Sequence, residues 1–369
     1  MNFMSSEDQI AYRDSVATML AAEVTAESIR ARWDSPKGID EKLIQQLNEL
    51  GLNTMLVPES CGGLGLSEQD FILLAQECGR AALPEPLVDN VLVANAMLAD
   101  VACSDLVSAK QCEDLLSEVA AGKVMLACGH WINPFINMAD IHQWLLLSHG
   151  DEVHLVESSA VELLPQRSAD PSRRIFKVNW QPKAETRIAN GEAGAGLWRR
   201  ALNRGALGVA AQLIGLSESI LHRAVGFTAD REQFGRPVGS NQAVKHLLAD
   251  CAVSLEFAKP VMARAAYAVG SNSSDADCAV SHAKVAASRA AQLCARHGMQ
   301  VHGAMGYTWE CDLHIWMKRC WAIDKTWGDA GFHKNRIHER LLDPSTLMGA
   351  EHTFTSITSE TFNSQKGAA

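Results

Sequence analysis

The C-terminal half of the chain repeats apolar residues at helical spacing, and this pattern constrains the fold more than any other feature. One helical face is formed by Leu213, Leu216, Ile220, Ala224 and Phe227. A second face follows at Val244, Leu248, Cys251, Leu255, Ala258, Met262 and Ala265. Pro260 should kink this second helix. Two more helices are predicted over residues 276–297, which are rich in alanine, and 312–322. Four such helices are typical of a four-helix bundle.

The first 120 residues are also predicted to be helical. Ser6 is followed three residues later by Gln9, which is the spacing of a capping box. A second helix is predicted over 41–50, and Ser67 is an N-cap candidate for a helix over 71–79. The glycine-rich segment 57–67 does not follow a predicted strand, so a connecting turn is favoured over a phosphate-binding loop.

The middle of the chain has a different pattern. Short β-rich runs at 124–128, 144–147, 153–156 and 175–178 are separated by turn residues, which predicts a small β domain. The predicted organisation is therefore a helical domain at 1–121, a β domain at 122–190, a bundle at 191–350 and a polar tail at 351–369.

Composition excludes several classes of function. The net charge of −10 over 369 residues disfavours nucleic-acid binding, which needs a concentrated positive surface. No apolar run reaches the eighteen residues of a membrane span. The ten cysteines are scattered without a CxxC pair, which predicts reduced thiols and a cytoplasmic protein.

Residues 230–246 form the first stretch that could carry chemistry. Arg231, Phe234, Arg236 and Gln242 lie where one bundle helix ends near 235–237 and the next begins. A guanidinium group can hold a pyrophosphate, and an aromatic ring can pack on a ligand ring. The same residues could instead cap a helix and close the end of the bundle, and the pattern alone favours neither interpretation.

Residues 300–308 form the second stretch, which follows the third bundle helix. Gln300 is followed by Gly303 and Gly306, and these glycines allow backbone amides to approach a ligand closely. A plain helix-to-helix turn would have the same pattern. His297 and His302 lie nearby without a carboxylate at helical spacing, so no metal site is predicted.

In this order and spacing, the two stretches resemble the acyl-CoA dehydrogenase family. The segments 57–65 and 77–80 resemble the family's "VPE..GG.G" and "E..GR" motifs, and Arg231-x-x-Phe234-Gly235 with Gln242 resembles its strongest marker. The resemblance implies a mainly α fold with an N-terminal helical domain, a small middle β domain and a C-terminal four-helix bundle. Here the β domain looks shortened.

The resemblance also implies an activity, which is the removal of two hydrogens from the α- and β-carbons of an acyl-CoA with FAD as the cofactor. Arg231 would hold the FAD pyrophosphate, Phe234 would pack near the ADP half and Gln242 would bind polar groups. Gln300 and Gly303 would line the adenine end. In the family these contacts reach across an interface to FAD seated on a neighbouring subunit, and an electron-transferring flavoprotein reoxidises the flavin.

The sequence departs from the family where the catalytic base should be. One family position for the glutamate corresponds to Trp327, just before Gly328, and indole cannot accept a proton. The other position corresponds to Gly205, which has Asn203 and Arg204 beside it. Two nearby carboxylates, on Asp324 and Asp329, are poorly placed candidates for the base.

The β domain departs as well, since the family's "TEP..GSD" and "W.TN" segments are missing between residues 122 and 190. A chain with the reach-across residues but without the base resembles one subunit of the α2β2 acyl-CoA dehydrogenases of bacterial steroid breakdown, which act on bulky acyl groups. The partner would be a homologous subunit that carries the base. A self-sufficient homotetramer with an aspartate base and a non-enzymatic scaffold of the same fold remain as alternatives.

Overall fold

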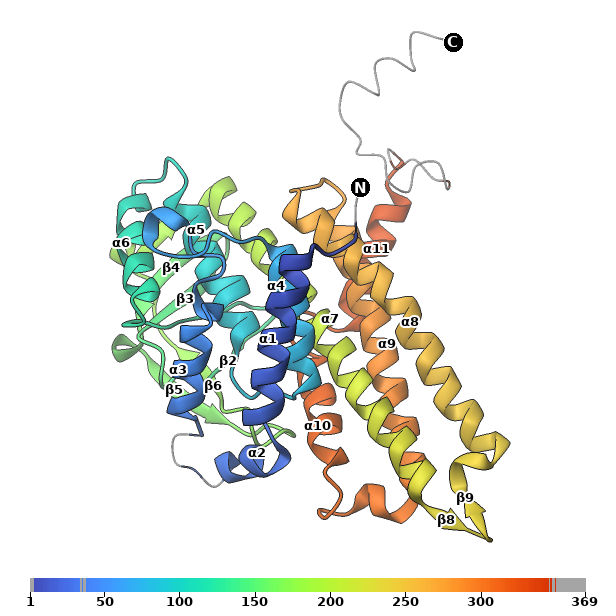
Figure 1. Cartoon of the computed structure of the whole chain (residues 1–369). Coiled ribbons are helices and arrows are strands. Elements are labelled where there is room, and N and C mark those ends of the chain that lie inside the picture. The colour runs from blue at the N-terminus through green and yellow to red at the C-terminus, as the bar shows by residue number, and fades with distance from the viewer. Residues whose placement is uncertain (1–2, 34, 36–37, 345, 347–348, 350–369) are drawn as a thin grey trace, which may run out of the picture.

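The computed structural model describes residues 3–33, 35, 38–344, 346 and 349. The predicted polar tail at 351–369 lies outside the described residues. Figure 1 shows most of the N-terminal helices on one side, together with the strands of the middle region, and the long C-terminal helices on the other. Within the described part of the chain, no helix is both long and apolar enough to cross a bilayer.

The N-terminal region is helical, as predicted. Its helices are α1 (Glu7–Glu23), α2 (Ala26–Trp33), α3 (Glu41–Glu49), α4 (Glu68–Arg80), α5 (Ala96–Ala102) and α6 (Ala109–Ala120), with a π-helical segment η3 (Val88–Asn95) before α5. Capping boxes start two of them. Ser6 exchanges hydrogen bonds with Gln9 at the start of α1, and Ser67 does so with Asp70 at the start of α4.

Two small sheets follow. The first has the strand order β1 (Leu126–Gly129), β3 (Trp144–His149), β4 (Glu152–Glu157) and β7 (Arg187–Ala189). The second has the order β2 (Phe135–Asn137), β6 (Ile175–Asn179) and β5 (Glu162–Gln166). Side chains of both sheets, including Ile136, Leu145 and Phe176, share one apolar core. Strands β2, β5 and β7 were not predicted, because they are short or, in β5, contain a proline.

The C-terminal region is the bundle, made of α7 (Gly191–Asp230), α8 (Gln242–Gly270), α9 (Ala276–His302), α10 (Leu313–Ile323) and α11 (Ala330–Leu342). Helix α8 runs through Pro260 as one helix. Most alanines of α9 are buried and let it pack closely between α7 and α8. The predicted four helices are all present, whereas α11 was not predicted.

Two predicted boundaries in the bundle are wrong. Helix α7 ends at Asp230, and residues 232–237 form a hairpin of β8 (Glu232–Gln233) and β9 (Arg236–Pro237). The physical reason is the turn, since Phe234 and Gly235 both have positive φ, as a tight hairpin requires. Helix α9 continues to His302, so Gln300 lies on a helix and not in a loop.

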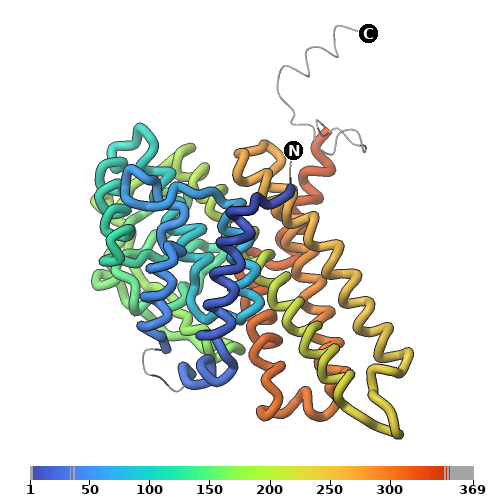
Figure 2. Tube along the Cα trace, viewed as in Figure 1, coloured from blue at the N-terminus to red at the C-terminus, as the bar shows by residue number. Residues whose placement is uncertain are grey.

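Helix α4 joins the two halves by crossing α7 at very short distance. A Cβ added at Gly215 would lie 1.9 Å from the Gln76 carbonyl oxygen, and one at Gly79 would lie 2.1 Å from that of Gln212. The crossing therefore needs glycine on both helices. Figure 2 follows the trace from the blue N-terminal helices into the yellow and orange bundle.

Candidate functional site

Trp327 lies at the centre of the candidate acyl site and is fully buried in the loop between α10 and α11. A Cβ added at Gly205 on α7 would lie 2.2 Å from Trp327 Cδ2. The two positions at which the resemblance places the family's glutamate therefore touch each other, and neither carries a carboxylate. The Trp327 indole lies directly against the backbone of Gly205.

The backbone holds Trp327 in an unusual conformation. Its φ is +53°, and Gly328 after it has φ +90°. A bulky residue in the left-handed region costs about 1–3 kcal/mol, so its surroundings must hold it there. His130 is stacked on the indole with an interplanar angle of 15°. His333 Nε2 donates to the Trp327 carbonyl oxygen at 2.9 Å.

A third aspartate, Asp89 of η3, contacts the indole directly. Trp327 Nε1 donates to Asp89 Oδ1 at 2.7 Å. Removal from water raises the pKa of Asp89, against the opposing effects of the indole hydrogen bond and of Arg173. Asp89 was not predicted as a site residue, because it belongs to an apolar segment far away from Trp327 in the chain.

Asp329 and Asp324, the two predicted base candidates, have structural contacts. Asp329 is the N-cap of α11, where its Oδ1 accepts from the Phe332 amide at 2.9 Å, and this hydrogen bond lowers its pKa. Asp324 is buried and its Oδ2 accepts from Gln292 Nε2 at 3.0 Å. Within the described residues, neither carboxylate has a hydrogen bond to the Trp327 side chain.

Among the described residues, only a small cavity is found next to the Asp89 carboxyl group. A cavity of about 30 Å³ lies there, between Asp89, Arg173, Val209 and Thr326 among others. That volume holds about one water molecule. The side chain of Trp327 itself occupies the space directly beside Gly205.

Gly205→Ala should destabilise the chain by about 1–3 kcal/mol, because the new methyl group would meet the indole ring. Gly226→Ala on the same helix is the matched control. A Cβ there meets nothing within 4 Å, so that variant should gain up to about 1 kcal/mol from helix propensity. Urea denaturation measures both. In a Trp327→Ala background the penalty at position 205 should disappear, and a penalty that persists there would contradict the contact.

Burial of His333 beside Trp327 makes the stability of the fold depend on pH. Burial, followed by the charge of Lys284, lowers the pKa of His333 from 6.5 to about 3. Above pH 6.5 the imidazole is neutral in both the folded and the unfolded chain. Below pH 6.5 only the unfolded chain takes up the proton, so stability falls by up to about 1.4 kcal/mol per pH unit until pH 3 is approached.

The midpoint of urea denaturation of the unmodified chain should therefore decrease as the pH is lowered from about 7 to about 5. His333→Gln should reduce this change of the midpoint with pH. His338→Ala, which removes an exposed imidazole on the same helix, should leave the change as it is in the unmodified chain. Buried His130 and His142, each with a pKa lowered to about 4 by burial, also contribute to the pH dependence. An unchanged pH dependence in His333→Gln would contradict the assignment.

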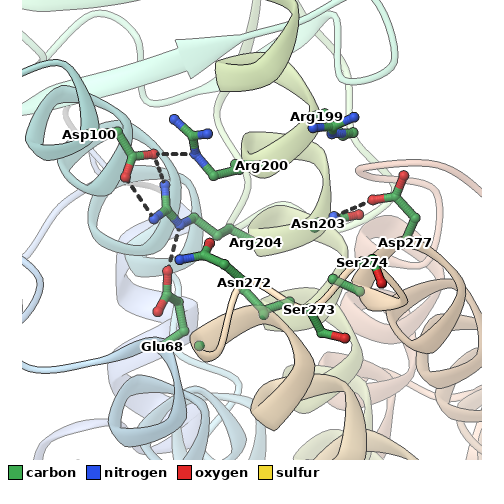
Figure 3. A pocket seen from close by; sticks show the side chains of 13 residues that line it. Glu68, Asp100, Arg199, Arg200, Asn203, Arg204, Asn272, Ser273, Ser274 and Asp277 are labelled. Carbon is green, nitrogen blue, oxygen red and sulfur yellow. Dashed lines mark hydrogen bonds and ion pairs between the residues drawn. The ribbon is translucent and has the colours of Figure 1, made fainter. Parts of the chain in front are cut away.

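A large polar pocket of about 700 Å³ lies one turn before Gly205, between α4, α5, α7 and the connection from α8 to α9. Figure 3 shows ion pairs that join Arg200 and Arg204 to acidic residues of the pocket. Arg204 donates to Asp100 Oδ2 at 2.6 Å and to Glu68 Oε1 at 2.9 Å, and Arg200 donates to Asp100 at 3.0 Å. Burial alone would lower the pKa of Arg204, but these ion pairs raise it.

The predicted flavin-binding residues lie at the other end of the bundle (Figure 1). Arg231 follows α7, Phe234 is at the tip of the β8–β9 hairpin and Gln242 begins α8. All three are exposed, Phe234 almost completely at 99%. The Arg231 guanidinium has no ion pair with any residue that the structure describes, whereas Arg236 Nη2 donates to Asn241 Oδ1 at 2.8 Å.

The second predicted group is at this same end. Gln300 is exposed on the last turn of α9, and Gly303 ends that helix with φ +58° and open space beside it. The rings of Phe227 and His302 stack at 4.1 Å, which fixes the ends of α7 and α9 together. His297 Nδ1 lies 3.0 Å from the Leu247 carbonyl oxygen. Both histidines thus have structural contacts.

Comparison with known proteins decides the family. Models of the "Acyl-CoA dehydrogenase, N-terminal domain" and "Acyl-CoA dehydrogenase, C-terminal domain" match residues 6–123 and 192–342. Acyl-CoA dehydrogenase IpdE2 of Mycobacterium tuberculosis (strain ATCC 25618 / H37Rv) is 31% identical over 315 residues, which is 85% of this chain and 91% of IpdE2. The chain belongs to the acyl-CoA dehydrogenase family. The family's cofactor is FAD, and the mainly α fold expected from the resemblance is confirmed.

One further relative is similar in sequence, and two solved structures are similar in fold. IpdE2 of Mycolicibacterium smegmatis (strain ATCC 700084 / mc(2)155) is 29% identical over 85% of this chain and 92% of its own length. The ChsE4-ChsE5 complex from Mycobacterium tuberculosis contains a chain that superposes with a TM-score of 0.82 at 21% identity, covering 94% of this chain and all of that one. A variant of the Tcur3481-Tcur3483 steroid acyl-CoA dehydrogenase gives a TM-score of 0.80 at 23% identity, covering 90% of this chain and 97% of that one.

Proposed function

We propose that this chain is the base-lacking subunit of a two-chain, FAD-dependent acyl-CoA dehydrogenase. One observation carries the proposal. Trp327 and Gly205, which the resemblance places at the family's two base positions, pack against each other, and neither has a side chain that can accept a proton. The base and the acyl site would come from a homologous partner.

The residues at the end of the bundle fit the role of holding FAD for that partner. An exposed guanidinium without an ion pair in the described structure and an almost fully exposed phenylalanine suit a phosphate-bearing ligand and a protein interface. Arg231 would bind the pyrophosphate, with Phe234 and Gln242 beside the ADP half. Gln300 and Gly303 would line the adenine end. FAD, when bound, supplies the acceptor for the β-hydrogen.

The relatives suggest the substrate class and the assembly. Two of the similar folds are in complexes of two differently named chains, and one of these is called a steroid acyl-CoA dehydrogenase. We propose an α2β2 assembly that acts on a bulky, steroid-derived acyl-CoA and passes electrons to an electron-transferring flavoprotein. The ten cysteines are all free thiols, which is compatible with work in the cytoplasm.

The second candidate is a self-sufficient enzyme with an aspartate as the base. Asp89 is better placed for that role than Asp324 or Asp329. Asp89 has a raised pKa and touches the indole at the family's base position. Asp89→Asn separates the candidates. In a partner-dependent enzyme the variant should leave turnover within about twofold, whereas loss of a general base should cost about 10²–10⁴-fold.

The direct test is turnover of a steroid-type acyl-CoA with an artificial electron acceptor. The chain alone should be inactive, and co-expression with a homologous chain that carries a glutamate should give activity. Turnover by the purified chain alone would overturn the proposal. A complex that binds no FAD and stays inactive would favour the non-enzymatic scaffold.

A further inference from the structure

Three possible metal ligands converge on the hairpin that joins β3 and β4. His149 and Glu152 face each other across a two-residue turn, and His154 follows two residues after Glu152, so all three side chains lie on one face. His149 Nδ1 and His154 Nε2 each lie 3.2 Å from Glu152 Oε2. The three ligand atoms lie within 4.8 Å of one another. None of them takes part in the acyl or flavin sites.

The hydrogen bonds around His154 leave one of its nitrogens facing an acceptor. The Thr186 hydroxyl donates its hydrogen to the Lys183 carbonyl oxygen at 3.0 Å. Thr186 Oγ1 therefore accepts from His154 Nδ1 at 2.9 Å. In the neutral ring Nε2 then carries the lone pair. His154 is 1% exposed, and its Nε2 points at a carboxylate oxygen. Two acceptors that face each other at this distance need a proton or a metal ion between them.

The two distances from Glu152 Oε2 to the histidine nitrogens fit a small divalent metal ion. A tetrahedral zinc ion with ligands at about 2.0–2.2 Å places neighbouring ligand atoms roughly 3.3 Å apart, close to the observed 3.2 Å. We propose that His149, Glu152 and His154 bind one zinc-class divalent ion, with water in the remaining position. Imidazole and carboxylate ligands suit zinc, copper and nickel.

The surroundings complete the site. Thr186 fixes the ring of His154, and Arg187 Nη1 binds Glu152 Oε1 at 2.6 Å, which leaves Oε2 free for the metal. The side chain of His149 is 61% exposed and gives the ion access from solvent.

The ion would stiffen the junction between the first sheet and the bundle. Trp198 Nε1 of α7 donates to the Glu152 carbonyl oxygen at 2.9 Å. A Cβ added at Gly194 would lie 2.0 Å from the Asp151 carbonyl oxygen, so the hairpin turn and the start of α7 are in close contact. The proposed metal ion would thus have a structural role. The proposal does not depend on the proposed function.

The test uses the purified full chain, stripped with a chelator and titrated with Zn²⁺ by calorimetry. One equivalent should bind. His149→Ala should weaken this binding about 100-fold, and Thr186→Val, which removes only the support of His154, should weaken it about tenfold. His338→Ala removes an exposed histidine on α11 and should bind as the unmodified chain does. Because His149 is exposed, its replacement should leave the unfolding temperature of the metal-free chain unchanged.

Titration with Co²⁺ distinguishes this site from the ten cysteines. Nitrogen and oxygen ligands give visible bands without the near-ultraviolet thiolate band, and His149→Ala should abolish the visible bands. A thiolate band that persists in that variant would overturn the proposal. Absence of stoichiometric binding would also overturn it, and would assign a proton to His154 Nε2.

Discussion

Replacing Trp327 by alanine should lower the free energy of unfolding by about 3–5 kcal/mol. The indole is fully buried against Gly205 and His130, so its removal leaves a cavity. It also leaves the Asp89 carboxyl without its 2.7 Å donor in a place where water is scarce. Urea denaturation followed by circular dichroism measures the loss.

Trp321→Ala is the matched control for this prediction, because Trp321 lies on α10 and is 42% exposed. It should cost about 1 kcal/mol or less. Trp327→Ala should also remain inactive without a partner, since it adds no carboxylate at either base position and Asp89 is not the base in the proposed function. A loss at position 327 as small as that at position 321 would contradict the packing, and turnover by the variant alone would contradict the absence of a base.

Replacing Arg231 by alanine should weaken FAD binding to the two-chain complex about 100-fold and lower turnover at limiting FAD accordingly. The Arg231 guanidinium is exposed and has no ion pair in the described structure, so its removal should not disturb the fold. Titration of the flavin-free complex with FAD, followed by flavin fluorescence, measures the affinity.

Two variants sharpen this experiment. Arg231→Lys keeps the charge but loses the two-pronged hydrogen bonding, so its loss should be about tenfold. Arg167→Ala removes an exposed arginine from the connection between β5 and β6 and should change the affinity less than about twofold. Size-exclusion chromatography checks that each complex still assembles. An Arg231→Ala complex with unchanged FAD affinity would contradict the assignment.

Local signals in the sequence predicted much of this fold. The capping residues Ser6 and Ser67 start helices where expected, and the apolar spacing from 213 onward and from 244 onward describes α7 and α8. The family resemblance placed Trp327 and Gly205 at the base positions. Their contact is known only from the structure, because no local signal in the sequence links residues so far apart.

The parts that the sequence did not predict depend on long-range contacts or backbone geometry. Asp89 becomes part of the site only because η3 packs against the loop of Trp327. The hairpin at 232–237 depends on positive φ at Phe234, which is unusual for an aromatic residue. The ion pairs of Arg204 join three helices whose charged residues look like ordinary surface positions in the sequence.

The visible absorption spectrum of the purified protein tests the central claim most directly. If this chain supplies only the arginine side of a shared flavin site, it should be colourless alone and yellow when purified with its partner, with one FAD shared by each pair of chains. A yellow chain with one FAD for each copy in the absence of any partner would contradict the account.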